Sequence, residues 1–402
     1  TTVGEIVAWV IGWDLILEML MAGSVVSKYW GVYLNQFFEL IGWNINTNIA
    51  IGSFNFDLAP VIIVAFFTAL LVMGTKIGAR VDGALTILKI AIVVFIVVVG
   101  FFYIKAENFT PFIPPSEPAA STDGSGVSAV MEQPLWQWAT GMAPSIYGVT
   151  GIISGAALVF FAFLGFDVVA TASEETINPK KNVPLGIGVG LGLIIVLYTL
   201  VAIVTTGMVS YKDLAKQSDP SLAVAFKMVG ADWAAKIISL GIVIGMATVV
   251  MVLLLGLTRV VFAMSRDGLL PRGLSYTGKH GTPVRLQIIV GVVMALIAAC
   301  CNVGILSDMV NIGTLSAFTL VAISIPIMRK KRPDLERSFK IPGNPWVPIL
   351  IAIANLWLMV NLSVLTWIRF VVWLIVGFAI YFGYGYRHAR LGAGELEVAA
   401  QE

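Results

Sequence analysis

The feature of this chain that most limits its fold is a series of ten apolar runs along its length. A helix needs about 20 apolar residues to cross a hydrocarbon core of about 30 Å. Continuous runs of this kind lack the alternation of barrel strands, and a helix satisfies its own backbone in lipid. We therefore expect an all-α polytopic membrane protein with spans at 5–33, 59–78, 83–104, 151–175, 184–208, 234–265, 286–304, 308–328, 346–365 and 367–386.

The amino-acid composition points to the same class. Of the 402 residues, 58% are hydrophobic and 12% are charged, whereas about 25% charged residues is usual in soluble domains. The net charge of +2 is too small to indicate a nucleic-acid partner. The two cysteines, Cys300 and Cys301, are neighbours and there are only two histidines. We therefore expect neither a disulfide framework nor a metal site, and no cofactor.

Lys and Arg residues predict the orientation of the chain. If the first run leaves the cytoplasm, they fall mainly in the cytoplasmic connections, above all in the cluster at 329–340. This predicts a multi-pass protein of the cytoplasmic membrane with both termini in the cytoplasm. The long connection at 105–150 carries several prolines, a Ser/Gly/Asp tract and two tryptophans. It is expected to be an extended external loop, with a regulatory lid as the alternative.

Asp14, Glu18 and Lys89 are charged side chains that lie within the apolar runs. A charge at the centre of a spanning helix costs about 3 kcal/mol, so such residues are functional candidates. Asp14 and Glu18 lie one turn apart on one helix face, with Glu18 near the middle of the membrane. Glu18 is either functional or a structural carboxylate, and Asp14 is expected to be structural. Lys89 either exchanges a proton during turnover or extends to the cytoplasmic interface.

The fourth run contains the string FFAFLGFD at 160–167. Gly165 and Asp167 predict a helix that is broken near its middle, which membranes tolerate only where the freed backbone lines an enclosed cavity. The outer half would end in unpaired carbonyls from Phe160 to Phe163, a negative dipole end suited to an ammonium ligand. A straight helix with a packing glycine is the alternative. Asp167 would either cap the inner half-helix or meet a cationic side chain.

The sixth run offers a candidate for the wall of a binding site. Thr248 and Met251 are three residues apart and share a helix face. The flexible thioether of Met251 would adapt to a variable side chain. The glycines of this run are expected to serve helix packing.

Six motifs follow one another along the chain: FAFLGFD at 161–167, AT at 170–171, EETINPKKNVP at 174–184, AMSRDGLLP at 263–271, GTP at 281–283 and FKIPG at 339–343. In sequence and order they resemble the amino acid–polyamine–organocation superfamily of amino acid permeases. Within it, the chain is most similar to bacterial homologues of the cationic amino acid transporters. The resemblance covers nearly the whole chain.

The resemblance implies the fold of the bacterial sodium-coupled leucine symporter: five helices, an inverted copy of those five, and two further helices. Its site lies between the broken first and sixth helices. The fourth run here resembles that sixth helix, so 1–402 would be a single transporter domain that contains family helices 3–12 and lacks the first two. Because the chain starts at Thr1 instead of Met, we expect a truncated gene model or fragment, without the N–H groups that hold the substrate's α-carboxylate.

The resemblance also implies roles for particular residues. Carbonyls around Phe161 and Ala162 would hold the α-ammonium group, Phe161 would close over the ligand, and Met251 would limit side-chain volume. Lys89 matches a fifth-helix lysine that replaces a sodium ion in proton-dependent relatives, and Glu18 matches an acidic position of the third helix. Lys89 is therefore expected to carry the coupling proton with Glu18 as its electrostatic partner. The expected substrate-binding residues are Phe160, Phe161, Ala162, Leu164, Gly165, Asp167 and Met251.

The expected function is secondary active transport of amino acids by alternating access, and the resemblance implies that it is coupled to protons. The expected partners are amino acids, protons and the lipid bilayer. A membrane enzyme is disfavoured, because the spans contain no His-Glu-x-x-His motif, paired catalytic Asp or Ser/His arrangement. The sequence contains no repeated selectivity filter, which argues against an ion channel. An amino-acid-binding receptor or a non-transporting subunit of the same fold is the remaining alternative.

Overall fold

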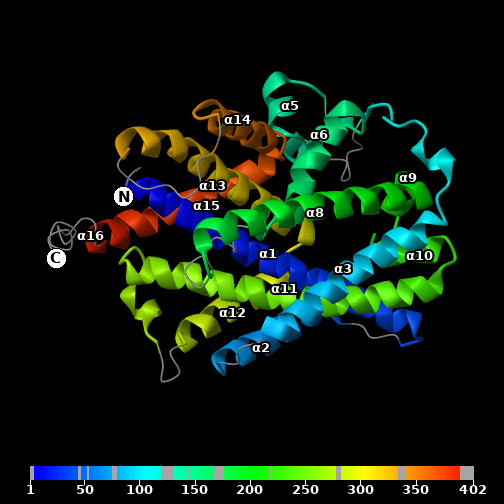
Figure 1. The fold of residues 1–402 in the computed structure, drawn as a ribbon, viewed down its shortest axis with the longest axis horizontal. Helices are drawn as coiled ribbons and strands as arrows, with labels where there is room; N and C mark the ends of the chain where they lie inside the picture. Colours follow the sequence, from blue (N-terminus) through cyan, green and yellow to red (C-terminus); the bar gives the residue numbers. More distant parts are fainter. Residues whose placement is uncertain are drawn as a thin grey trace.

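The fold is a bundle of helices connected by short β pairings and turns (Figure 1). The computed structural model describes residues 4–43, 47–51, 54–74, 79–118, 130–143, 145–166, 176–217, 220–277, 282–333, 341 and 343–389. Each of the ten apolar runs coincides with a helix: α1 (Glu5–Leu40), α2 (Leu58–Val72), α3 (Ala79–Phe101), α6 (Gly148–Val159), α8 (Pro179–Met208), α11 (Asp232–Arg266), α12 (Val284–Cys300), α13 (Val303–Lys331), α14 (Trp346–Val360) and α15 (Val364–Ile380).

The helices differ in length more than hydropathy alone predicts. Among the described residues, six helices are long and apolar enough to cross a membrane. One of these six is α15 taken together with the π-helical turn η5 (Tyr381–Gly385) and α16 (Tyr386–His388). The other four, α2, α6, α12 and α14, are shorter. Capping side chains set some of these ends: the Asp57 carboxylate accepts from Ala59 N–H at the start of α2, and Ser363 accepts from Thr366 N–H at the start of α15.

Short elements make up the connections between the long helices. An antiparallel pair, β1 (Asn48–Ile51) and β2 (Phe54–Asp57), precedes α2. The segment expected to be an extended external loop carries structure in its described part. It contains the 3-10 turn η1 (Ala106–Phe109), the helix α5 (Leu135–Thr140) and the antiparallel pair β3 (Glu117–Pro118) with β4 (Ser145–Ile146). Two short helices, α9 (Tyr211–Ala215) and α10 (Leu222–Met228), lie between α8 and α11.

Helices α1 and α11 form the centre of the bundle (Figure 1). They run antiparallel, because Gly12 lies against Met264 while Gly23 lies against Leu253. The largest hydrophobic cluster packs between α1, α2, α11 and α12 and includes Trp9, Met19 and Leu254. Glycines permit this close packing: a Cβ atom on Gly31 would lie 2.6 Å from the Ala59 Cβ of α2.

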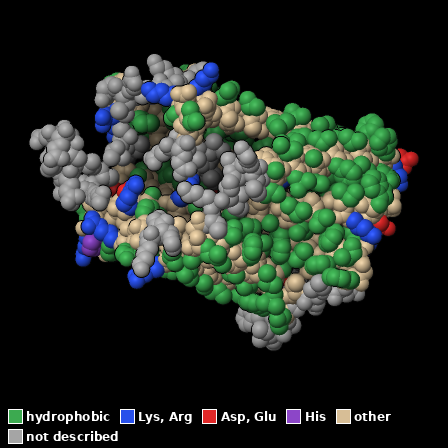
Figure 2. Space-filling view, turned by 60° about the horizontal axis from the view of Figure 1, so that its bottom comes forward, with side chains coloured by type: hydrophobic (Ala, Val, Ile, Leu, Met, Phe, Trp, Pro, Cys, Tyr) green, Lys and Arg blue, Asp and Glu red, His purple; other side chains and the backbone are tan. Residues whose placement is uncertain are grey.

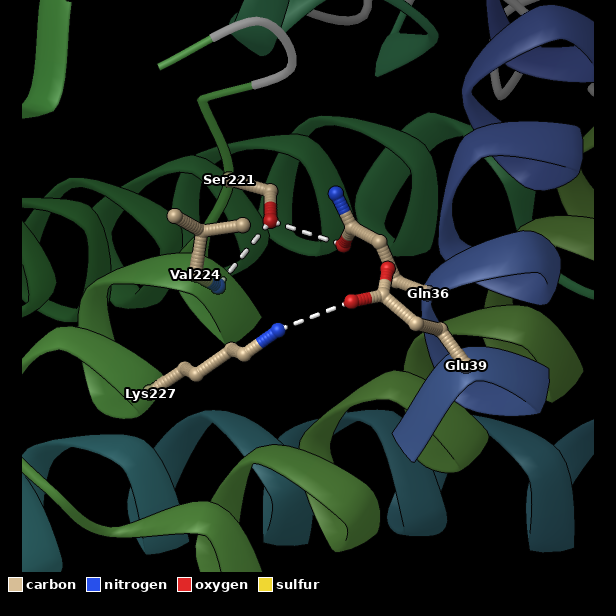
Figure 3. A network of polar contacts seen from close by, with 5 residues as sticks. All are labelled: Gln36, Glu39, Ser221, Val224 and Lys227. Atoms are coloured by element: carbon tan, nitrogen blue, oxygen red, sulfur yellow. Dashed lines mark hydrogen bonds and ion pairs between the residues drawn. The ribbon is translucent and has the colours of Figure 1, made fainter. Parts of the chain in front are cut away.

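Polar contacts attach α10 to the end of α1 (Figure 3). The Ser221 hydroxyl accepts from Val224 N–H, which caps α10, and donates to the Gln36 side-chain oxygen of α1 at 2.8 Å. Lys227 forms an ion pair with Glu39 at 2.9 Å. These contacts fix α10 across the end of α1, next to the start of α11.

Hydrophobic side chains cover most of the face shown in Figure 2, and charged side chains gather towards the two ends of the long axis. This is the distribution expected of a protein that spans a membrane along that axis. Both ends of the described chain lie at one end of the bundle (Figure 1). The Tyr381 hydroxyl donates to the Glu5 carboxylate at 3.0 Å, which joins the two ends directly.

Candidate functional site

The predicted interruption of the fourth apolar run is present. Helix α6 ends at Val159 and is followed by the 3-10 turn η2 (Phe160–Phe163). Leu164 is extended, with φ −62° and ψ 151°, and Gly165 adopts φ 103°. The positive φ explains why a glycine stands at this point of an apolar helix, since other residues rarely adopt it. The straight-helix alternative is therefore excluded for the described part of this run.

The expectation of bare carbonyls at the break is wrong for two of them. Leu164 N–H donates to the Phe161 carbonyl at 3.2 Å, closing a 3-10 turn. The Tyr198 hydroxyl of α8 donates to the Ala162 carbonyl at 2.9 Å. One turn earlier, the Asn311 amide of α13 donates to the Leu158 carbonyl at 3.3 Å. The end of the half-helix thus attracts hydrogen-bond donors, as the negative end of a helix dipole should.

Aromatic contacts hold the break between two helices. Phe160 and Phe166 both contact Phe318 of α13, with ring centroids 6.1 and 5.3 Å apart. Phe163 meets the Tyr198 ring of α8 edge-on at 5.4 Å. Since residues on both sides of Gly165 are anchored on one side chain, the geometry of the break is fixed by tertiary packing.

The described surroundings of the break are apolar on one side. Phe161 and Leu164 pack against a small cluster made by Ala22 of α1, Leu253 of α11 and Val310 of α13. By contrast, no heavy atom of the residues that the structure describes lies within 4 Å of a Cβ built on Gly165. An apolar wall and a carbonyl end therefore meet at this point.

Met251 does not face the break. It packs against the large cluster between α1, α2, α11 and α12, whereas Val249 and Leu253 of the same helix belong with Phe161 and Leu164. At 100° per residue, Met251 lies about 200° around the helix from Val249. Met251 therefore lies on a different face of α11 from the residues that pack at the break.

Lys89 and Glu18 lie at different levels of the bundle. The Lys89 Cγ atom is 3.3 Å from a Cβ built on Gly245 of α11. Glu18 of α1 lies five residues before Gly23, which faces Leu253, so the antiparallel register places it near Thr258. The thirteen helical steps from Gly245 to Thr258 span about 20 Å of helix. This register places the two positions at different levels along α11.

Both acidic residues of α1 are buried. Asp14 is 0% exposed and Glu18 is 3% exposed. Leu17, between them, contacts Gly313 of α13, so this part of α1 faces the protein interior. Asp167, the last predicted substrate residue, lies outside the described residues, as does the inner half of the broken helix at 167–175.

Two polar residues at the break were not predicted from the sequence. Tyr198 and Asn311 each donate to a carbonyl of the broken helix from a distant part of the chain. A tyrosine and an asparagine within apolar runs are visible in the sequence, and the asparagine is fully buried. Their partners become known only once the helices are packed.

Comparison with known proteins gives consistent matches over the chain. The amino acid permease family model matches residues 1–383. The chain is 40% identical over 400 residues to the branched-chain amino acid permease BcaP of Bacillus subtilis (strain 168), covering 97% of this chain and 78% of that protein. It is also 40% identical, with the same coverage, to the methylthioribose transporter of the same organism. Identity to the mitochondrial cationic amino acid transporter 3 of Arabidopsis thaliana is 34% over 341 residues, or 83% of this chain and 51% of that protein.

Proposed function

Since this chain belongs to the amino acid permease family, we propose that it carries amino acids across the cytoplasmic membrane by alternating access, holding the substrate's amine at the break near Gly165. Its relatives are named as permeases and transporters, which sets it among carriers and not among enzymes. The further details proposed are ten spans, the inverted-repeat arrangement and cytoplasmic termini.

The carbonyl end of the broken half-helix is the observation that carries this proposal. A zwitterion needs a group that accepts hydrogen bonds from its ammonium and that carries negative charge density. The end of η2 supplies both, because the Phe161 and Ala162 carbonyls lie at the negative end of the turn and each keeps a second lone pair beside the hydrogen bond it already accepts. The Tyr198 hydroxyl already donates to Ala162 there, which supports the view that this end attracts donors.

The substrate we propose is an amino acid with an apolar side chain. The residues that pack with Phe161 and Leu164 are Ala22, Leu253 and Val310. A surface of this kind favours a hydrocarbon side chain over a charged one. Phe161 is proposed to close over the ligand, and Val249 and Leu253 replace Met251 as the side-chain wall.

Methylthioribose is the competing substrate, because a transporter named for it is as similar to this chain as the branched-chain permease. Methylthioribose has a thioether and hydroxyl groups but no amine. Carbonyl oxygens form their strongest hydrogen bonds with charged donors. We therefore prefer an amino acid, whose ammonium group is such a donor, as the substrate.

Proton coupling is proposed to involve Lys89. Its side chain is partly buried within α3 and packs across Gly245 of α11. A helix contact through a glycine brings the lysine close to the backbone of a neighbour, where a change in packing during transport would alter its surroundings. Glu18 is proposed as a second coupling group in its own buried environment, at a level about 20 Å away along α11.

A substitution at the break tests the proposal. Gly165→Ala forces a side chain onto φ 103°, so we expect at least a tenfold loss of radiolabelled leucine uptake in proteoliposomes. Gly188→Ala is the matched control, because Gly188 is helical, lies on α8 and has open space beside it. Unlabelled leucine should compete with the label and methylthioribose should not. Normal uptake by a folded Gly165→Ala variant would contradict the role of the break.

Proton coupling has a separate test. Lys89→Ala should abolish the rise in uptake that an inward proton gradient produces, while leucine exchange without a gradient continues. An unchanged response to the gradient would remove Lys89 from the coupling mechanism without affecting the substrate site.

A further inference from the structure

A groove runs along the outer side of α2 and α12, two helices that lie side by side (Figure 1). Its volume is about 490 Å³, within the range of small-molecule sites. The described residues that line it include Val61, Ala65 and Val72 of α2 and Ile288, Val292 and Leu296 of α12. Ala65, Ile288 and Val292 are exposed, whereas Val64 and Val290 on the opposite faces pack into the large cluster between α1, α2, α11 and α12. The groove therefore opens away from the protein, towards lipid.

Small side chains where the two helices meet create the groove. A Cβ built on Gly291 of α12 would collide with the Thr68 side chain of α2, and Ala65 and Ala69 beside this contact leave space that larger residues would fill. Thr68 carries the one polar side chain among the described lining residues. Its hydroxyl donates to the Val64 carbonyl of its own helix at 2.7 Å. The described lining is therefore almost entirely hydrocarbon, which favours an apolar occupant.

The groove has the length of one leaflet of a bilayer. The eleven helical steps from Val61 to Val72 extend about 16 Å, and half of a hydrocarbon core of about 30 Å is about 15 Å. A helix about 10 Å wide would occupy about 1,300 Å³ over that length, more than twice the volume of the groove. These dimensions favour a single acyl chain over a helix of another protein.

The antiparallel packing of α2 and α12 identifies the ends of the groove. Thr68 lies against Gly291, and a Cβ built on Gly74, just past α2, lies 3.9 Å from the Thr282 side chain, just before α12. The start of α12 is therefore level with the end of α2. The distribution of Lys and Arg in the sequence predicts that this end lies at the cytoplasmic surface.

A basic side chain, that of Arg285, stands at this end of the groove. Arg285 is exposed and precedes Ile288 by three residues, so the two share the outward face of α12. Its guanidinium lies 5.4 Å from the centre of the Tyr276 ring. Within the described part of the chain it forms no ion pair with Asp or Glu. An anionic group at the membrane surface would supply the missing charge partner.

We infer that this groove binds an anionic phospholipid, with one acyl chain along α2 and α12 and the phosphate at Arg285. The guanidinium can donate two N–H groups to a phosphate, and basic residues between spanning helices at the cytoplasmic surface suit anionic headgroups. A zwitterionic lipid fits the groove equally well but brings a cation next to Arg285. The lipid site lies outside the proposed substrate site and does not rest on the proposed function.

Lipid binding is measured on the purified full chain in detergent, without transport. The chain is titrated with dioleoylphosphatidylglycerol, which is anionic, or with dioleoylphosphatidylcholine, which has the same acyl chains and no net charge. Native mass spectrometry counts the bound lipids. We expect one saturable site with at least tenfold higher affinity for the phosphatidylglycerol. Dihexanoylphosphatidylglycerol has the same headgroup but short chains and should bind at least tenfold more weakly than the long-chain lipid.

Two variants separate the headgroup contact from the chain contact. Arg285→Gln should lower the affinity for dioleoylphosphatidylglycerol at least fivefold and change that for dioleoylphosphatidylcholine less than twofold. Ala65→Phe fills the groove and should lower the affinity for both lipids at least fivefold. The matched controls are Arg387→Gln on α16 and Ala202→Phe on α8, because both residues are exposed and neither lines the groove. Both controls should bind lipid as the wild type does.

Three results would overturn the inference. The first is equal affinity of the wild type for the two long-chain lipids, and the second is wild-type affinity in both Arg285→Gln and Ala65→Phe. The third is a dimer that Ala65→Phe dissociates, because a second copy of the chain would then occupy the groove. Gly165→Ala should bind lipid normally whether or not its transport is lost, since Gly165 is not part of the lining.

Discussion

Helices α11 and α8 have nearly the same mean hydropathy but opposite surroundings. In α11, 56% of the most apolar window is buried within the protein, against 6% in α8. Hydropathy therefore indicates that both helices prefer an apolar environment, and it does not tell whether protein or lipid supplies it.

Polar residues and glycines distinguish the two helices better than hydropathy does. Ser239, Thr248 and Thr258 are buried in α11, and its Gly241 meets Ile92 of α3. Four glycines of α8, at positions 186, 188, 190 and 192, have no heavy atom of the described part of the chain within 4 Å of a built Cβ. A glycine marks a helix contact only when a neighbour occupies the space that its missing side chain leaves.

The two helices are also held in different ways. Helix α11 packs along its length, whereas α8 is fixed near its end. Lys105 N–H and the Asn108 side chain both donate to the Gly207 carbonyl, at 2.9 and 2.7 Å. Lys212, just beyond α8, pairs with Glu117. Substitutions should therefore affect buried and exposed helices differently.

A carboxylate on the exposed face of α8 should give the largest effect. Val189 is 63% exposed, and Val189→Asp would place a charge against lipid at a cost of about 3 kcal/mol. The buried carboxylates of α1 differ from this case, because other helices and not lipid surround them. Thermal unfolding in lipid nanodiscs and the membrane-inserted yield should both fall relative to the control Val189→Leu. Equal values for the two variants would show that this face meets water.

Added volume at a packed glycine should give the next largest effect. Gly31→Leu would collide with Ala59, whose Cβ is 2.6 Å from the built position and cannot rotate away. Overpacking of this kind costs about 1–3 kcal/mol. Gly188→Leu makes the same chemical change in open space and gains helix propensity. Its melting temperature should be unchanged or slightly higher; a matching loss in both variants would mean that α8 is covered as tightly as α1.

The sequence was sufficient to locate the helices and the break. Apolar runs predicted ten helices, and Gly165 within FFAFLGFD predicted the interruption found there. Helix ends were less accurate, because they depend on capping contacts such as that of Asp57. The sequence could not reveal which helix face meets which neighbour. Met251 packs with the large cluster and not with the residues at the break, and the Tyr198 hydroxyl contacts the Ala162 carbonyl; neither contact could be read from the sequence.

The ion pair beyond the end of α8 should give the smallest effect. Lys212 and Glu117 are 2.8 Å apart, and their side chains are 48% and 43% exposed, so solvent and salt screen their attraction. The hydrogen bond and charge of Glu117 raise the pKa of Lys212 above its ordinary value of 10.5. A raised lysine pKa means that the pair stabilises the fold at pH values below 10.5 and that this contribution disappears as the pH rises through the folded-state pKa. Lys212→Met should therefore lower the melting temperature slightly at pH 8 in low salt, less in high salt, and not at all once wild-type Lys212 has lost its proton. A difference that persists unchanged in strong alkali would show that Lys212 holds α8 by packing instead of by charge.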